Sequence, residues 1–363
     1  MRRIYLCSYV PFLFAGLAFG QQPQVPKQMT EEVSIIVTGK DNVPVEDLKE
    51  SDLTVKDNNK AQQIISFDKV AAGVPAAQGK PGLHNLVLID ALNSTYSDVP
   101  ENHLAMLKIV HELSKPGDIT ALFLHPKLQI VSDPAAQEGG PELLRKFARQ
   151  GFDPANPKTE AFGWVFTDPL ALFQIFTPAG VIDNVRMKST LASLQVIASN
   201  YQGRSGRKNL YWITRNVPIP MGETGAGYNE SKLNSGQNSK TVGDDLSIFA
   251  KDADNTKRML TNSGISLYPI DSRALAIDNM KVSDQASMTD AASATGGLAY
   301  TSPRDLSVAV RDAINDARVS YVLRYAISDL KNDGKMHRIK IDTTRKDVKL
   351  RYREGYYGPS GGK

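Results

Sequence analysis

The chain has 363 residues, of which 41% are hydrophobic and 23% are charged, so we expect an ordinary buried core and no global disorder. A formal net charge of +4, with no long basic run, argues against the binding of nucleic acid or other polyanions. Cys7 is the single cysteine, which excludes intramolecular disulfides and thiolate metal sites, so stability must come from apolar burial.

Residues 1–20 have the pattern of a secretory signal peptide. Arg2 and Arg3 form a basic start, residues 4–19 are mostly apolar, and small residues precede Gln21. The apolar stretch is too short for an ordinary spanning helix, although an uncleaved anchor is the alternative. We expect export to the periplasm or the extracellular space, as a mature chain with no cysteine and no membrane span.

The first part of the expected mature chain predicts a small β segment. Residues 21–32 are rich in Gln and Pro and predict a flexible lead-in. Within residues 33–70, strands are predicted at 33–38, 53–55 and 63–67, and a turn at 57–59 joins the last two as a hairpin. These strands alone would bury too little surface to be stable. Residues 71–82, rich in Ala, Gly and Pro, predict a linker.

Residues 84–318 alternate between strand and helix patterns. Residues 86–89 are apolar without alternation, which is typical of a strand covered on both faces in a parallel sheet. Further strands are predicted at residues 119–124, 127–131, 209–214, 265–270 and 298–300. Helices are predicted at residues 100–114, 141–150, 170–176, 179–201, 244–262, 286–294 and 303–318. The pattern predicts an α/β fold with a doubly wound, mostly parallel sheet and helices on both faces.

The chain returns to β structure in residues 319–357. Strands are predicted at residues 320–327, 336–343 and 348–352, with a turn at 332–334 and a tail at 358–363. We expect this segment to pair with residues 33–70. Together they predict a β-sandwich-like domain of about six strands.

The order of strands and helices, with Asp90-x-x-x-Ser94 after the first buried strand, resembles the von Willebrand factor type A domain. More narrowly, the chain resembles the VWFA-related family first described from Acidobacteria. The matching motifs lie at residues 44–48, 52–55, 88–93, 206–212, 264–271, 321–325 and 353–357. The resemblance implies a type A-like α/β domain and a non-enzymatic, protein-binding role of the adhesion or scaffold type.

Type A domains carry a metal-ion-dependent adhesion site, in which Asp-x-Ser-x-Ser, a Thr and a later Asp hold a small cation through oxygen atoms. The resemblance places Asp90 and Ser94 on this motif, with Thr177 as the candidate Thr. Leu92 replaces the first Ser, and Arg215 follows the strand after which the family has Asp. We therefore expect a degenerate site without a cofactor. The alternative is an adhesion module in which Asp90, Ser94 and Thr177 hold Mg²⁺.

The carboxyl ends of parallel strands form the usual binding edge of an open α/β sheet, and we expect a protein partner to bind there. The predicted partner-binding residues are Asp90, Asn93, Ser94, Arg215 and Asp271. Arg215 is predicted to replace the metal by pairing with Asp90 and offering its guanidinium group to a partner's carboxylate. A cation beside Arg215 would be repelled by about 4 kcal/mol per unit charge at ~4 Å and an effective dielectric near 20. The alternatives are a turn-capping role for Asp90 and a solvated loop position for Arg215.

Catalytic motifs are not evident in the sequence. The five histidines lack a metal-binding spacing, and neither a Gly-x-Ser-x-Gly elbow nor a nucleotide-binding glycine fingerprint is present. We therefore predict that the protein is not an enzyme. A secreted hydrolase of unrecognised type is the remaining alternative.

Overall fold

The structure is a computed structural model, and the described parts of the chain are residues 29–74, 76–90, 92–93, 118–124, 128–132, 179–215, 217, 219, 242–273, 282–329 and 331–360. Several sequence predictions lie outside these residues. They are the signal peptide, the helices at 100–114, 141–150 and 170–176, and the site positions Ser94 and Thr177.

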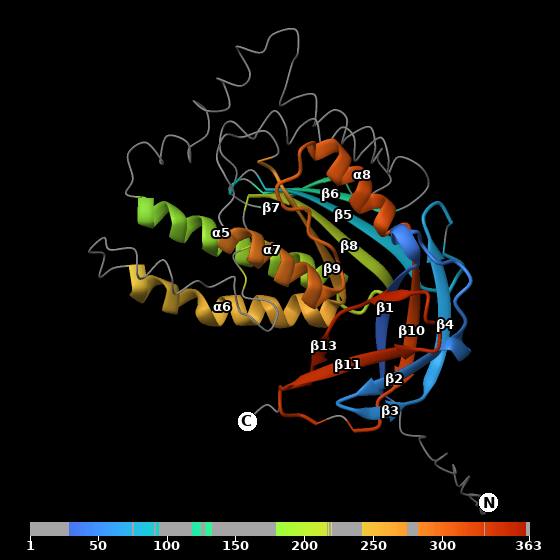
Figure 1. Ribbon diagram of the computed structural model, residues 1–363. Coiled ribbons are helices and arrows are strands. Elements are labelled where there is room, and N and C mark those ends of the chain that lie inside the picture. The colour runs from blue at the N-terminus through green and yellow to red at the C-terminus, as the bar shows by residue number, and fades with distance from the viewer. Residues whose placement is uncertain are drawn as a thin grey trace, which may run out of the picture.

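A five-stranded sheet forms the centre of the molecule, with the order β7-β6-β5-β8-β9 (Figure 1). Its strands are β5 (Gly82–Asp90), β6 (Asp118–Leu124), β7 (Leu128–Ser132), β8 (Gly206–Thr214) and β9 (Ile265–Asp271). All neighbours are parallel except β7, which forms an antiparallel hairpin with β6. The predictions of a mixed α/β fold and a mostly parallel sheet are confirmed.

Strand β5 begins four residues earlier than its apolar run indicates. Its first residue, Gly82, pairs in register with Gly206 of β8. The two backbones approach so closely that a Cβ atom on Gly206 would lie 2.0 Å from the carbonyl oxygen of Gly82, and Gly206 has a φ of 118°. Only glycine fits this position, so the pair of glycines extends the contact between the two strands beyond their apolar segments.

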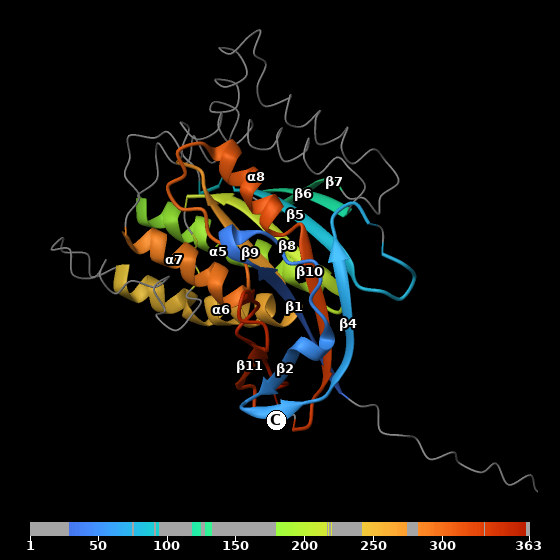
Figure 2. The same ribbon diagram turned by 45° about the vertical axis from the view of Figure 1, so that its right-hand side comes forward.

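The described helices are α5 (Ala179–Tyr201), α6 (Val242–Ser263), α7 (Val282–Thr295) and α8 (Leu306–Asp316). Helices α5, α6 and α7 lie on one face of the sheet and α8 lies on the other in both views (Figures 1 and 2). Among these helices, none is long and apolar enough to cross a membrane. The predicted strand at 298–300 is reduced to a single bridge between Tyr300 and Ile270.

Alternate residues of the central strands face different helices. Leu86 and Leu88 of β5 and Trp212 of β8 pack in one apolar core with residues of α5, α6 and α7, such as Leu194 and Met288. The residues between them are also buried, and on the opposite face α8 packs against β9. Burial on both sides explains why these strands have unbroken apolar runs.

Two four-stranded sheets are built from both ends of the described chain, and together we call them the β region. The first has the order β12-β1-β10-β4 and the second β13-β11-β2-β3. Their strands are β1 (Thr30–Thr38), β2 (Leu53–Asp57), β3 (Lys60–Gln62), β4 (Ile64–Ala71), β10 (Val319–Ala326), β11 (Met336–Thr343), β12 (Lys349–Arg351) and β13 (Gly355–Tyr357). One apolar core joins them, with contributions from β1, β2, β10 and β11. A sandwich geometry for these sheets stays a prediction.

The hairpin predicted between residues 53–55 and 63–67 is wrong in its second strand. Short β3 pairs with β2 across a turn in which Asn58 and Asn59 have φ values of 46° and 66°. After Gln63 the chain passes to the other sheet, where β4 pairs with β10. The ring of Phe67 stacks on Tyr321 of β10 with centroids 5.0 Å apart, a contact that favours this pairing.

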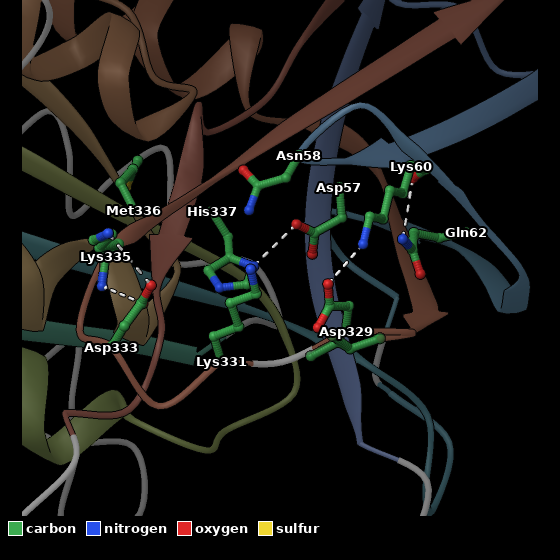
Figure 3. Close-up of a pocket in the computed structure, with 11 residues that line it drawn as sticks. Asp57, Asn58, Lys60, Gln62, Asp329, Lys331, Asp333, Lys335, Met336 and His337 are labelled. Carbon is green, nitrogen blue, oxygen red and sulfur yellow. Dashed lines mark hydrogen bonds and ion pairs between the residues drawn. The ribbon is translucent and has the colours of Figure 1, made fainter.

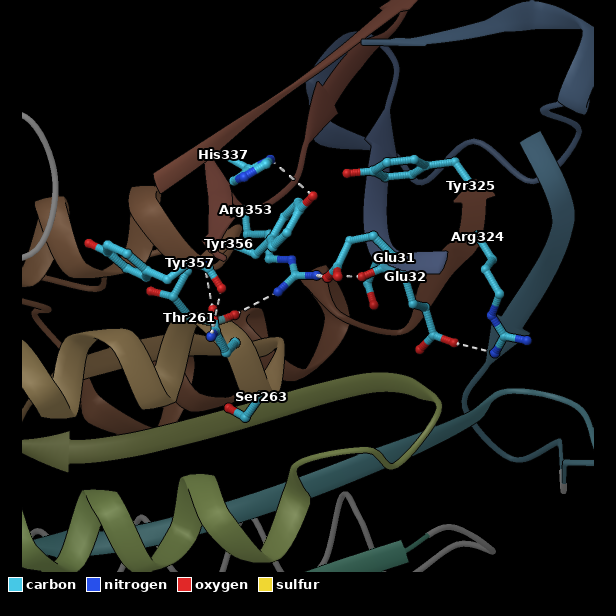
Figure 4. A network of polar contacts seen from close by, with 12 residues as sticks. Glu31, Glu32, Thr261, Ser263, Arg324, Tyr325, His337, Arg353, Tyr356 and Tyr357 are labelled. Carbon is cyan, nitrogen blue, oxygen red and sulfur yellow. Dashed lines mark hydrogen bonds and ion pairs between the residues drawn. The ribbon is translucent and has the colours of Figure 1, made fainter. Parts of the chain in front are cut away.

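A polar network attaches the β region to the amino ends of the parallel strands (Figure 4). Glu32 of β1 accepts hydrogen bonds from the Ser205 hydroxyl at 2.6 Å, the Gly206 amide at 2.7 Å and Arg324 Nη2 at 2.8 Å. Arg353 donates to the Thr261 carbonyl at 2.6 Å and pairs with Glu31. The β region therefore lies at the end of the sheet opposite to the expected binding edge.

Candidate functional site

Three side chains lie in a row at the carboxyl edge of the parallel sheet. Asp90 ends β5, Thr214 ends β8 and Asp271 ends β9. Thr214 pairs in register with Asp271, and the Thr214 hydroxyl donates to Asp90 Oδ2 at 2.8 Å. Asp90 and Asp271 therefore flank Thr214 at the edge where open α/β sheets bind ligands.

The Asp90 carboxylate is enclosed by hydrogen-bond donors. Its Oδ1 accepts from the Asn93 backbone amide at 3.0 Å. Its Oδ2 accepts from Asn93 Nδ2 at 2.8 Å, from Trp212 Nε1 at 3.2 Å and from the Thr214 hydroxyl. The side chain is 0% exposed. Three of these four hydrogen bonds are made to Oδ2, and all four come from the same domain.

Burial and hydrogen bonding act in opposite directions on this group. Burial raises the pKa of Asp90 above its ordinary value, while the bonds from Asn93, Thr214 and Trp212 limit the rise. The indole N–H of Trp212 can only donate, so Oδ2 must act as an acceptor. The donor arrangement therefore suits an ionised carboxylate that is shielded from solvent.

Asn93 connects the end of β5 to helix α5. Its Nδ2 donates both to Asp90 and to the Thr190 hydroxyl of α5, the latter at 2.9 Å. Because Asp90 also accepts from the Asn93 amide three residues later, the turn-capping role considered for Asp90 is present. The loop that carries the type A-like motif is thus held against α5 where it leaves the sheet.

A second pair of charges lies at the end of β9. Arg273 Nε donates to Asp271 Oδ1 at 2.8 Å, and both side chains are buried. Arg273 Nη2 donates to the backbone carbonyl of Arg215 at 2.9 Å. This arginine therefore links the ends of β8 and β9, and Arg215 joins the site through its backbone. Asp271 Oδ2 is buried and has no hydrogen-bond partner within the described part of the chain.

The structure brings only part of the predicted site together. Asp90 and Asn93 are in direct contact, and Asp271 is linked to Arg215 through Arg273. Asp90 accepts hydrogen bonds from Asn93, Trp212 and Thr214, and its pairing with Arg215 stays a prediction. Asp90 and Asp271 are 0% and 1% exposed, so their carboxylates are not positioned for direct contact with a partner.

Sequence reasoning missed Trp212, Thr214 and Thr190 as members of the site. Two of them could have been found from the alternation of side chains along a strand. Trp212 and Thr214 lie two residues apart and therefore face the same side of β8. Thr190 lies in the middle of a helix, and its role depends on how α5 packs. No group of three or more His, Cys, Asp or Glu side chains within the described residues could hold a metal ion.

Comparisons with known proteins identify distant structural neighbours. No family model matches the chain, and no curated protein matches it. A von Willebrand factor type A protein from Catenulispora acidiphila is 9% identical with a TM-score of 0.35, covering 86% of this chain and 75% of that chain. The ArnB paralog VWA2 from Sulfolobus acidocaldarius is 10% identical with a TM-score of 0.32, covering 92% and 76%.

A third neighbour is proximal thread matrix protein 1 from the mussel byssus, which is 14% identical with a TM-score of 0.30 and covers 70% of this chain and 49% of that chain. The resemblance of the chain to type A domains stays a prediction from the sequence.

Proposed function

We propose that this chain is an exported, non-enzymatic protein-binding module of the adhesion or scaffold type, with a degenerate metal site. The observation that carries the proposal is the enclosure of Asp90. A carboxylate at the position of the family's metal ligand accepts four hydrogen bonds from its own domain. It is therefore used to hold the binding edge together and not to coordinate a cation or activate water.

The charge near this edge also disfavours a cation. Arg215 occupies the position after β8 at which the family has a metal-ligating Asp, and Arg273 approaches the same edge from β9. The guanidinium group of Arg273 is already used by Asp271 and the Arg215 carbonyl. Arg215, whose side chain is half-buried, is the candidate contact for an acidic group of the partner.

In this proposal the predicted site residues have two different roles. Asn93, Ser94 and Arg215 contact the partner, whereas Asp90 and Asp271 are positioning residues beneath them. Export is supported by the signal-peptide pattern of residues 1–20. Residues from both chain ends build the β region, which we propose carries the α/β domain and leaves its carboxyl edge accessible.

Site-specific photocrosslinking tests the proposal. A photoreactive phenylalanine derivative at position 215 should capture a protein partner from the exported fraction of the source cells, in EDTA as well as in Mg²⁺. The same group at Lys340, an exposed position on β11, serves as the matched control. With the captured protein purified, Arg215→Ala should weaken binding about tenfold or more, since a charged hydrogen bond contributes roughly 1.5–3 kcal/mol.

Three outcomes would contradict the proposal. Capture that requires Mg²⁺ would favour the metal-dependent adhesion module held by Asp90 and Ser94. Equal capture from positions 215 and 340 would mean that the carboxyl edge is not the binding surface. Turnover of peptide or ester libraries by the purified chain would favour the hydrolase alternative.

A further inference from the structure

A cavity of about 290 Å³ lies in the β region (Figure 3). It is formed between the β2–β3 hairpin, residues 57–62, and the connection from β10 to β11, residues 327–337. Its lining is dominated by charged and polar side chains from the two chain ends. The volume is at the lower limit for small-molecule sites, which suits a ligand of about ten non-hydrogen atoms or fewer.

A histidine and an aspartate form the inner wall of this cavity. His337 Nδ1 lies 3.1 Å from Asp57 Oδ1, and both side chains are buried. Asp57 Oδ2 accepts hydrogen bonds from the hydroxyl groups of Tyr356 at 2.7 Å and Tyr325 at 3.1 Å. A carboxylate only accepts hydrogen bonds, so Nδ1 of His337 carries the proton.

This arrangement determines what the other ring nitrogen offers. When Nδ1 is the donor in a neutral imidazole, Nε2 is a hydrogen-bond acceptor. The ring's hydrogen bonds within the described residues, to Asp57 and to the Tyr356 hydroxyl, are both made at Nδ1, and the ring lines the cavity. The stacked ring of Tyr356, 4.8 Å away between centroids, holds the imidazole in place. His337 therefore presents an oriented ring nitrogen, which accepts a hydrogen bond when the ring is neutral.

The cavity also contains Lys331, whose charge acts on the neighbouring Asp329 without a close ion pair. Lys60 pairs with Asp329 at 2.6 Å, and Lys335 lies 3.9 Å from Asp333. Lys331 is exposed and makes no ion pair or hydrogen bond within the described part of the chain. Figure 3 shows its side chain beside His337. An anionic group here would gain a direct ionic contact with Lys331.

We propose that this cavity binds a small ligand that carries both a hydroxyl group and an anionic phosphate or carboxylate group. Lys331 contacts the anionic group, and the hydroxyl group donates to Nε2 of His337. Asp57, Tyr325 and Tyr356 are positioning residues that orient the imidazole. Joining the two sheets accounts for the bonds to Asp57, whereas the cavity lined by His337 and by the exposed Lys331 suits a ligand.

Calorimetric titration of the full chain tests the site. Glycerol 3-phosphate and glycerate are the probes for the two anionic groups, and glycerol is the control that lacks an anion. We expect saturable binding of at least one anion and none of glycerol. Lys331→Met should weaken the binding about tenfold, because an ionic hydrogen bond contributes roughly 1.5–3 kcal/mol. Lys340→Met, on β11 outside the cavity, should leave it unchanged.

A second readout separates binding at His337 from a general effect of charge. The ¹⁵N resonance of His337 Nε2 should shift during the titration of the wild-type chain, with the same midpoint as the heat. Absence of saturable binding at millimolar concentration, equal weakening by Lys340→Met, or an unchanged Nε2 resonance would each overturn the proposal. The residues involved are separate from Asp90 and Arg215, so this test is independent of the proposed function.

Discussion

The Thr214 hydroxyl donates to Asp90 Oδ2 across 2.8 Å and joins two parallel strands whose ends are 124 residues apart in the chain. The bond lies at the position where the resemblance to type A domains predicts a metal ligand. Trp212 and Asn93 complete the enclosure of the same group. A position that the sequence marks as a ligand is thus used to hold the edge of the sheet.

Asp90→Ala should destabilise the fold. The change leaves the Trp212 indole and the Thr214 hydroxyl buried without their acceptor, and unsatisfied buried polar groups cost about 1–3 kcal/mol each. We expect the free energy of unfolding in urea to fall by about 2–4 kcal/mol. Asp342→Ala, which removes an exposed pair with Lys56, should leave the urea midpoint nearly unchanged. Equal effects of the two changes would show that the enclosure is not stabilising.

Divalent cations should not bind tightly at the carboxyl edge. Calorimetric titration of Mg²⁺ and Mn²⁺ into residues 21–363 should give no saturable heat and no shift in the melting temperature, because the Asp90 oxygens are engaged by four donors. Micromolar binding that Asp90→Ala abolishes would contradict the degenerate-site proposal and restore the adhesion-site alternative.

Lys208 should make stability rise with pH in mildly alkaline solution. Burial lowers the pKa of Lys208 from 10.5 to about 8, so between these values the unfolded chain binds more protons than the folded chain. Stability therefore increases as pH rises through the folded-state pKa. Between roughly pH 7.5 and 9.5 the gain should be about 1–2 kcal/mol.

Comparing the wild-type chain with Lys208→Met isolates this effect. The free energy of unfolding in urea is measured for both proteins across the same pH range. The methionine keeps the length of the side chain without its charge, so the variant should lack the Lys208 contribution to the slope. Parallel pH profiles for the two proteins would contradict the assignment.

Glu32 should contribute stability that is lost in acid. Burial alone would raise the pKa of Glu32, but hydrogen bonds from Gly206, Ser205 and Arg324 outweigh it and lower the pKa below 4.5. The stabilisation is therefore present above the unfolded-state pKa and is lost as pH falls through the folded-state value. Glu32→Gln should lower the free energy of unfolding at pH 7 by about 1–3 kcal/mol.

The loss caused by Glu32→Gln should shrink as the pH is lowered, because protonation removes the same charge from the wild-type chain. Thermal unfolding from pH 7 down to pH 3 measures this convergence. Glu46→Gln, at an exposed pair with Lys69, is the control and should not change the profile. If the difference in stability between the wild-type chain and Glu32→Gln stayed constant over this pH range, the charge of Glu32 would be excluded as the cause of the stabilisation.

The sequence by itself determined the strands and helices that have strong local signals. The apolar run at residues 86–89 and the alternation in 336–343 correspond to β5 and β11, and the apolar spacing in 179–201 corresponds to α5. Such patterns depend on which faces of an element are buried. The spacing of apolar residues along the sequence indicates these faces directly.

Contacts between distant segments were decided only by the tertiary structure. Asp57 and His337 are 280 residues apart, and no local pattern indicates that β2 and β11 place them side by side. Likewise, the sequence identified Asp90 as a strand-end carboxylate. Its hydrogen-bond donors, however, come from β8 and from the turn that follows β5. Whether a polar side chain faces solvent, a ligand or its own domain depends on the strands packed around it. The physical reason is that hydrogen bonding and desolvation are set by neighbours in space and not by neighbours in sequence.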